Sequence, residues 1–389
     1  MARETLPATS LRKRPWKSGA SAPRQRHKSI GLQPLRGRIH TYNLCFLGFG
    51  NVNRTLVRLL EDRSQELRER YGITYRITGI ATHRLGRIAD PNGLDLTAVS
   101  EAVCGAGAPA REKPGIDLNS SASETAPKTV RDWLAASRAD VLFEATSLNV
   151  KDGQPAVDHI RAALEHGAHA ITANKGPIVH AYRELRDLAV ARGKKFLFES
   201  TVMDGVPIFS LFDQMPAIRL QGFHGILNST TNVIISEMEQ GLTFDEALKK
   251  AQALGVAETD ATHDIEGWDA AVKTAALITV LMDIPVRIEE IQREGIRDLT
   301  PQALRNARRD GWPFKLVCRA QRGAEAITAS VRPEQVPLSD PLAWVAGTSS
   351  IVYFETDIFP GLAITENNPG LEATAYGMLA DFVRAVTET

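Results

Sequence analysis

Two charged residues lie one helical turn apart in a stretch that is otherwise apolar. In the segment DIEGWDAAVK, Gly267 marks the expected start of a helix, with Asp269 in its first turn and Lys273 on the same face. On an exposed helix such a pair contributes only about 0.2–0.5 kcal/mol. Residues 270–282, however, are apolar nearly all round, which predicts a buried helix, where a charge is paired or functional. Asp269 and Lys273 are therefore candidate site residues.

Further charged residues accompany this pair. The upstream segment GVAETDATHD adds Glu258, Asp260 and Asp264, an acidic cluster that suits an ammonium group. Lys175, in AITANKGP, follows a β-rich run and precedes Gly-Pro, which is the position where open α/β sheets bind ligands. Spacing alone leaves open whether Lys175 is a solvated loop lysine.

A glycine turn points to a nucleotide. The segment GFGNVN carries Gly48 and Gly50 of the dinucleotide fingerprint GxGxxG, with Asn53 in place of the third glycine. It follows a short apolar strand, 43–47, and opens a helix expected from Val52 to about Arg70, as the fingerprint requires. This context favours dinucleotide binding over a plain glycine turn.

The end of the second expected strand, YRITGIATH, bears on the choice of cofactor. Where an NAD site usually has an acid, this chain has Ala81, Thr82, His83 and Arg84, with Arg87 close by. An arginine there can pair with the 2′-phosphate of NADP. The pattern favours NADP, with NAD possible and a solvated basic loop as the alternative reading.

The elements that must position these residues follow an α/β order. DVLFEATS, HAITANK and KKFLFES are expected strands separated by helical patterns such as AVDHIRAALEHG, which predicts a Rossmann-type doubly wound parallel sheet. After Glu199 the pattern indicates a second α+β domain for catalysis and dimerisation. It includes a helix with a Thr243–Glu246 capping box and a stop at Gly255, a strand SSIVYFETD and a closing helix ATAYGMLADFV that can pack back onto the first domain. Residues 105–128 are expected to form a loop.

The domain organisation expected from these elements has three parts, which are a disordered basic tail (1–40), a nucleotide-binding domain (41–206, completed by 346–389) and a substrate-binding and dimerisation domain (207–345). The tail holds ten Lys/Arg and one acid, Glu4, whereas the chain as a whole has a formal net charge of +0. It is open to interpretation as an organelle transit peptide, a nucleic-acid-binding arm or an inert extension. The acidic body makes nucleic-acid binding an unfavoured reading.

Composition excludes several classes of protein. The 389 residues are 43% hydrophobic and 24% charged, as in a globular protein, and no apolar run is long enough for a transmembrane helix. The three cysteines, Cys45, Cys104 and Cys318, have no CxxC spacing. They argue against a disulfide framework or structural zinc and fit a reducing compartment such as the cytoplasm, with organellar import through the tail as the alternative.

A series of motifs carries a family resemblance. GFGNV, EATS, TANKGP, ESTVMDGVP, GILNSTTN, EALKKAQALGVAETDATHDIEGWDAAVK and GTSSIVYF occur in the order expected of homoserine dehydrogenase, from about Tyr42 to the C-terminus. The chain resembles that family most specifically between Gly225 and Lys273. Its end at Thr389 predicts a monofunctional member without a C-terminal ACT domain.

The resemblance implies an activity and a site. The activity is the reversible NAD(P)H-dependent reduction of L-aspartate 4-semialdehyde to L-homoserine, on the route to threonine, methionine and isoleucine, by a homodimer that forms through the sheet of the second domain. The family's catalytic lysine falls on Lys273 and its second lysine on Lys175, while its substrate-binding acids fall on Glu258 and Asp269, supported by Asp264. The implied cofactor contacts are Gly48, Phe49, Gly50, Asn51, Val52, Arg84, Thr146, Lys175 and Gly370. The implied ligands of a monovalent cation such as Na⁺ are Glu199, Val202, Asp204 and Val206.

The chain departs from the family pattern at Asn53, at Asp204, at Ser229 and in the C-terminal stretch ENNPGLEATAY, which keeps Gly370 alone of the usual glycines. Larger side chains are expected to narrow the cofactor site or abolish dinucleotide binding. Two alternatives follow, a homologue that has lost catalysis and acts as a binding or regulatory protein, and an enzyme acting on a related amino-aldehyde or amino-alcohol.

Overall fold

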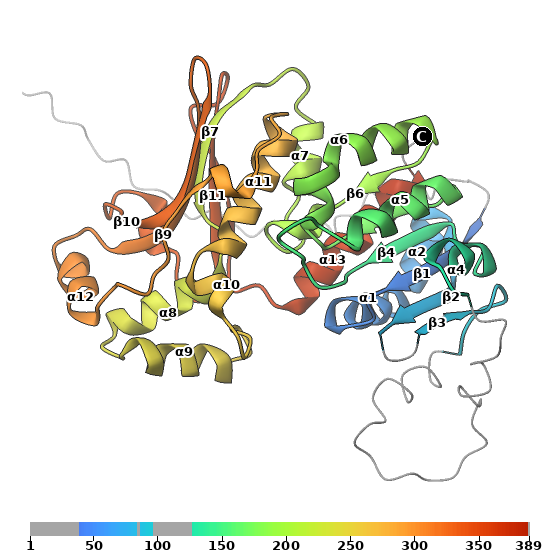
Figure 1. Cartoon of the computed structure of the whole chain (residues 1–389), viewed down its shortest axis with the longest axis horizontal. Helices are drawn as coiled ribbons and strands as arrows, with labels where there is room; N and C mark the ends of the chain where they lie inside the picture. The colour runs from blue at the N-terminus through green and yellow to red at the C-terminus, as the bar shows by residue number, and fades with distance from the viewer. Residues whose placement is uncertain (1–38, 84–85, 96–126, 388–389) are drawn as a thin grey trace, which may run out of the picture.

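The structure, a computed structural model, describes residues 39–83, 86–95 and 127–387, which form two six-stranded sheets flanked by helices (Figure 1). The expectations for the basic tail and for most of the loop at 105–128 lie outside the described residues.

The first sheet has the strand order β3-β2-β1-β4-β5-β6. All neighbouring pairs are parallel except β2 and β3, which are antiparallel. The predicted doubly wound sheet is confirmed. Its strands are β1 (His40–Leu47), β2 (Ile73–Thr82), β3 (Gly86–Ala89), β4 (Val141–Glu144), β5 (His169–Thr172) and β6 (Phe196–Leu197). Its helices are α1 (Asn51–Asp62), α2 (Ser64–Tyr71), α4 (Val130–Ala136), α5 (Ala156–His166) and α6 (Gly176–Ala191).

One local prediction about this sheet was wrong. The helix expected to run from Val52 to about Arg70 is broken at Arg63, whose φ of −100° and ψ of 6° are not helical. The two pieces bury different partners, because α1 packs on the closing helix whereas α2 lies against β2 and buries only Leu67. Beyond β2 the chain returns from Gly86 as the edge strand β3, an element for which the sequence made no prediction.

The second sheet has the strand order β12-β11-β7-β9-β10-β8. It is mixed, since only β8 and β10 pair in parallel. Its strands are β7 (Leu220–Ile226), β8 (Gln292–Arg293), β9 (Phe314–Arg322), β10 (Ile327–Gln335), β11 (Ser350–Thr356) and β12 (Leu362–Glu366). The accompanying helices are α7 (Phe209–Asp213), α8 (Ser229–Glu239), α9 (Phe244–Ala253), α10 (Thr262–Ile265), α11 (Trp268–Leu281) and α12 (Pro301–Arg309), with 3₁₀ turns η1 (Glu199–Thr201), η2 (Ile288–Glu290) and η3 (Pro341–Trp344).

Helix α9 forms as its sequence predicts. The hydroxyl oxygen of Thr243 accepts a hydrogen bond from the backbone N–H of Glu246, and the Glu246 carboxylate accepts one from the backbone N–H of Thr243. Gly255, at φ +71°, follows the last turn in the left-handed conformation that glycine adopts without strain.

The closing helix α13 (Leu371–Thr387) returns to the first sheet, where it lies beside α1 (Figure 1). Phe382 packs edge-on against Tyr42 and Phe143 in the core of that sheet. Residues 346–389, expected to complete the first domain as a whole, divide instead between the two sheets. Strands β11 and β12 pair within the second sheet, and only α13 packs on the first.

Candidate active site

The first sheet reverses its strand order between β1 and β4, and a cleft of about 900 Å³ opens at the carboxyl ends of these strands. Ligands bind at this point in open α/β sheets. Gly48 follows β1 with φ +80°, and a Cβ there would lie 2.5 Å from the carbonyl oxygen of Ala145, which follows β4. Only glycine therefore allows the two loops to meet. At Gly50, by contrast, a Cβ would meet no atom within 4 Å, so the cleft is open beside it.

Helix α1 begins directly at the cleft. Its N-cap is Gly50, no side chain caps it, and its first turn holds no acid, so Asn51 and Val52 start a helix whose N–H groups suit a pyrophosphate. Phe49 and Thr146 also line the cleft.

Asn53 does not narrow the cofactor site, contrary to expectation. Its side chain is fully buried, and its Nδ2 donates to the carbonyl oxygen of Gly48 at 2.8 Å, behind the turn. It is absent from the residues that line the cleft. The amide thus ties the glycine turn to the helix, at the position where the fingerprint uses a third glycine for close packing.

Glu144, which sequence reasoning missed, organises the opposite wall. It is fully buried at the end of β4, where it accepts hydrogen bonds from the backbone N–H of Thr146 at 2.9 Å and the hydroxyl of Thr172 at 2.6 Å. Burial raises the pKa of Glu144 against the effect of these hydrogen bonds. The sequence signal for this residue was its position, because Glu144 directly ends the apolar run of β4 and an acid at such a position is expected to be buried.

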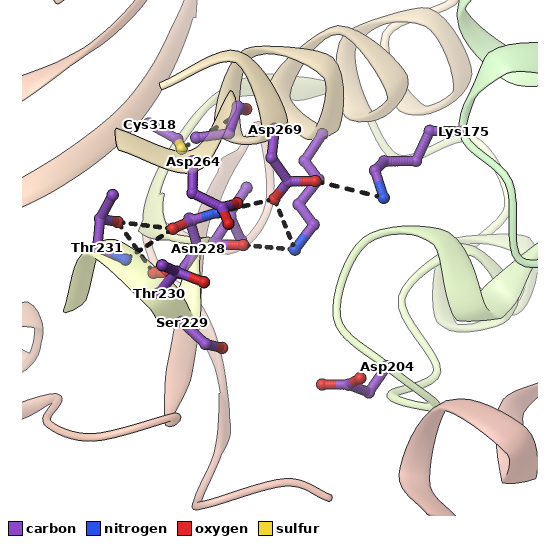
Figure 2. Close-up of polar contacts among 12 residues, drawn as sticks. Lys175, Asp204, Asn228, Ser229, Thr230, Thr231, Asp264, Asp269 and Cys318 are labelled. Carbon is purple, nitrogen blue, oxygen red and sulfur yellow. Dashed lines mark hydrogen bonds and ion pairs between the residues drawn. The ribbon is translucent and has the colours of Figure 1, made fainter. Parts of the chain in front are cut away.

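Lys175 and Lys273 meet at Asp269, as Figure 2 shows for the labelled Lys175 and Asp269. Lys175 Nζ lies 3.4 Å from Oδ1 of Asp269, and Lys273 Nζ lies 3.3 Å from Oδ2. The three side chains are only 17%, 18% and 21% exposed, in the order Lys175, Lys273 and Asp269. Lys273 Nζ also donates to the carbonyl oxygen of Leu227 at 2.7 Å.

The buried helix predicted from Gly267 onward is confirmed. Residues 270–272 and 274–279 of α11 are buried, and α11 packs against α6 of the first sheet and β9 of the second. Lys175 is the N-cap of α6, so the packing of these two helices brings its ammonium group to Asp269.

Asn228 is a second site residue that sequence reasoning missed. Its Nδ2 donates to Oδ1 of Asp264 at 2.7 Å and to Oδ2 of Asp269 at 3.0 Å, and its Oδ1 accepts from the backbone N–H of Thr231 at 2.8 Å (Figure 2). Asn228 follows the apolar strand β7 and caps α8, so the pattern ILN before STTN was the available signal.

Electrostatics distinguish the charged groups. Burial would raise the pKa of Asp269, but Lys273 and Lys175 hold it well below its usual range. Burial likewise disfavours charge on Lys273, yet Asp269 and Asp204 raise its pKa above the usual value. The pKa of Asp264 is raised, by burial first and then by Asp269. A deprotonated Asp269 therefore stands between two lysines, and Lys273 keeps its proton.

Two predicted site residues lie apart from this cluster. Glu258 is exposed, and within the described part of the chain no hydrogen bond or ion pair joins its carboxylate to Asp264, Asp269 or Lys273. Gly370 is exposed just before α13. Arg84 lies outside the described residues, whereas Arg87 lines the cleft and donates to the carbonyl oxygen of Lys128 at 3.1 Å.

The four residues expected to hold a cation lie on one turn, 199–206. Both carboxylate oxygens of Glu199 already accept hydrogen bonds, Oε1 from the backbone N–H of Phe209 at 2.7 Å and Oε2 from that of Ser210 at 2.9 Å. Asp204, at φ +45°, accepts from the hydroxyl of Thr374 at 2.5 Å. Val202 is buried beside them and Val206 is partly buried. Among the described residues, no group of three or more His, Cys, Asp or Glu side chains is arranged to hold a metal ion.

Asp204 also faces Glu366 at the end of β12. Burial and the neighbouring Asp204 raise the pKa of Glu366 to about 7. The substitution of Asp for the small residue expected at 204 therefore adds a carboxyl pair beside Lys273, and its side chain bonds to α13 through Thr374.

No described helix combines the length and apolar character needed to cross a bilayer.

Comparison with known proteins places these features in one family. Residues 207–383 match the family described as homoserine dehydrogenase, and residues 48–199 match its NAD-binding domain. The NAD(+)-dependent homoserine dehydrogenase of Pseudomonas canavaninivorans is 35% identical over 88% of this chain and 95% of its own length. The homoserine dehydrogenase of Methanocaldococcus jannaschii is 33% identical over 89% of this chain and 99% of its own length.

Solved structures agree. A homoserine dehydrogenase from Thiobacillus denitrificans superposes with a TM-score of 0.73 at 29% identity, covering 90% of this chain and 74% of that one. A hyperthermophilic archaeal homoserine dehydrogenase mutant in complex with NADPH superposes with a TM-score of 0.73 at 25% identity, covering 90% of this chain and 99% of that one. The nucleotide-binding cleft and the paired lysines thus occur in a chain that belongs to the homoserine dehydrogenase family, whose members are NAD(P)-dependent oxidoreductases.

Proposed function

We propose that this chain interconverts L-aspartate 4-semialdehyde and L-homoserine with Lys273 and Lys175 as its catalytic residues. The observation that carries the assignment of roles is Asp269, which pairs with both lysines at the junction of the two sheets. The reaction belongs to the biosynthesis of threonine, methionine and isoleucine.

The nicotinamide cofactor, when bound, supplies or accepts the hydride. In the reductive direction the carbonyl oxygen gains negative charge and then a proton, and the charged ammonium group of Lys273 is suited to hydrogen-bond that oxygen and donate the proton. Lys175, at the start of α6, supports the same oxygen from the cofactor side. Asp269 raises the pKa of Lys273, which keeps that ammonium group charged, and it forms an ion pair with both lysines.

We propose that acidic side chains bind the ammonium group of the substrate. Asp269 and Asp264 are held side by side by Asn228, which supports a shared role in binding that group. Glu258 enters the proposal on family resemblance alone, as the residue that closes over the substrate.

For the cofactor we infer a preference for NADP. The residues that line the described cleft include Arg87 but no aspartate or glutamate, so nothing there favours a ribose 2′-hydroxyl over a phosphate. Arg84 and Gly370 complete the proposed cofactor contacts on family resemblance.

A monovalent cation such as Na⁺ fits only part of the proposed site. Each carboxylate oxygen of Glu199 accepts a hydrogen bond from the first N–H groups of α7, and Oε2 also faces Arg384 at 3.4 Å, which disfavours this carboxylate as a direct ligand. The backbone carbonyl oxygens of Val202, Asp204 and Val206 remain as proposed ligands. To test this assignment, Na⁺ is exchanged for a bulky organic cation and the thermal unfolding midpoint is measured in both salts. An unchanged midpoint would contradict the proposed cation site.

The assembly, boundaries and location of the chain stay proposals of the same kind. We propose a homodimer, tested by analytical ultracentrifugation, in the cytoplasm. We divide the chain at 206 and 345, with α13 completing the first domain.

The activity is tested by incubating the purified protein with L-homoserine and either NADP or NAD, and following formation of the reduced nicotinamide. Turnover is expected with both, faster with NADP. A folded protein that binds cofactor but turns over neither way would favour the non-catalytic alternative, and turnover of another amino-alcohol in preference to L-homoserine would change the substrate.

A further inference from the structure

The cofactor cleft contains a histidine, His159, that was not predicted from the sequence to be a site residue. His159 projects from α5 and lines the cleft together with Arg87 of β3, His83 at the end of β2 and Val130 of α4. In a Rossmann sheet the end of β2 is where the adenosine ribose is recognised. His159 therefore lies at the adenosine end of the cleft, on a helix opposite the strand that normally reads the ribose.

The imidazole of His159 is poorly satisfied. Its Nδ1 is buried and has no hydrogen-bond partner among the described residues. Burial, and after it the neighbouring charge of Arg87, lower the pKa of His159 to about 4 against the weaker opposing effect of Asp158 on its own helix. The ring is thus neutral near pH 7.

The charges around the ring have one sign within the cleft. Arg54 and Arg87 line it with His159, and no aspartate or glutamate is among the lining residues that the structure describes. The carboxylate of Asp158 lies on the exposed side of α5. An anionic group of the cofactor would therefore meet arginine side chains and no acidic side chain among these lining residues.

Resting on the proposed function, we propose that His159 and Arg87 together bind the 2′-phosphate of NADP, and that His159 takes up a proton when the phosphate arrives. The phosphate neutralises the repulsion from Arg87 and offers the imidazolium an acceptor, so the protonated ring becomes favourable only in the complex. NAD has a hydroxyl in place of this phosphate and so offers no anion that would stabilise the protonated ring of His159. Selection of NADP over NAD then comes from two elements, β3 and α5.

The test is a calorimetric titration of the purified full chain with NADP and with NAD, in two buffers of different ionisation enthalpy at pH 7. For the wild type we expect tighter binding of NADP, with proton uptake on binding NADP but not NAD. The phosphate itself has a second pKa of about 6 and would release protons at a cationic site, so uptake cannot come from it.

His159→Gln is expected to raise the dissociation constant for NADP about tenfold, as for a lost charge-assisted hydrogen bond, and to abolish the proton uptake. The dissociation constant for NAD should change less than about twofold. His166→Gln, the same change on the exposed last turn of α5, serves as the matched control and should behave as the wild type.

A second variant keeps the test independent of any effect of His159→Gln on folding. Arg87→Gln should weaken NADP binding similarly and, in the free protein, move the NMR titration of the His159 ring to higher pH. An unmoved titration, or an unchanged ratio of NADP to NAD affinity in His159→Gln, overturns the inference while leaving NADP preference to the arginines. A wild type that does not prefer NADP overturns both the inference and the cofactor proposal, whereas turnover of L-homoserine with NAD would still support the activity.

Discussion

The ammonium group of Lys175 lies 3.4 Å from a carboxylate oxygen of Asp269, although 94 positions separate the two residues and each begins a helix beside a different sheet. This ion pair joins the start of α6, beside the first sheet, to the acidic cluster on α11.

Replacing Lys273 with Met should lower kcat/KM for L-homoserine oxidation by about 10²–10⁴, the range for loss of a general acid–base residue. The control is Lys250→Met, which removes an exposed lysine of α9 paired with Glu237 of α8 and should leave kcat/KM unchanged. Equal losses in both variants would show that the effect is not specific to the site.

Asp269→Asn should move the pH dependence of the reaction as well as its rate. Asp269 raises the pKa of Lys273 above its usual value, so neutralisation of Asp269 lowers that pKa. In the reduction of L-aspartate 4-semialdehyde, where Lys273 must hold a proton, the alkaline limb of the kcat/KM profile then moves to lower pH. The profile of this reduction up to pH 11 is the measurement, and a limb that stays in place while the rate falls would mean that Lys273 is not the group being titrated.

Gly48→Ala and Gly50→Ala should separate fold from function in the glycine turn. At Gly48 the positive φ and the approach of Ala145 predict a loss of at least about 1 kcal/mol in the free energy of unfolding. At Gly50 the added methyl group meets open space, so stability should persist while the dissociation constant for the cofactor rises. Chemical denaturation and calorimetric binding distinguish the two outcomes, and normal cofactor binding by Gly50→Ala would argue against a pyrophosphate at this turn.

A buried lysine in the second sheet should produce a pH-dependent stability. Burial lowers the pKa of Lys315 to about 8 from its ordinary 10.5, so between these values the unfolded chain binds more protons than the folded one. The contribution of Lys315 to stability therefore rises with pH across that window. Lys315→Met should remove this rise in a series of unfolding curves from pH 7 to 10.5, and a slope identical to that of the wild type would contradict the assignment.

The helices and the parallel sheet were predictable because each rests on local pattern. The capping box at Thr243 and the apolar surroundings of Asp269 carry their meaning in a few consecutive residues. The break at Arg63 was not predictable in this way, since the two pieces of helix follow one another directly and pack against different distant elements.

The candidate site divides along the same line. Lys273 and Asp269 are one turn apart and could be paired from spacing, whereas Asn228 and Glu144 act through hydrogen bonds to residues 28 or more positions away. Asn53 shows the reverse case, because a substitution that looked harmful in the motif turns its side chain away from the cleft.

The return of α13 to the first sheet has a consequence for synthesis of the protein. A ribosome completes every strand of that sheet before it begins the second sheet, yet the core that Phe382 closes stays open until the last helix emerges. The apolar surface of the nascent nucleotide-binding domain that α13 covers therefore stays exposed while more than 160 further residues are translated. A chaperone that shields that surface during translation should raise the yield of native protein. A truncated messenger RNA that encodes the chain only up to α13 should yield aggregated chains.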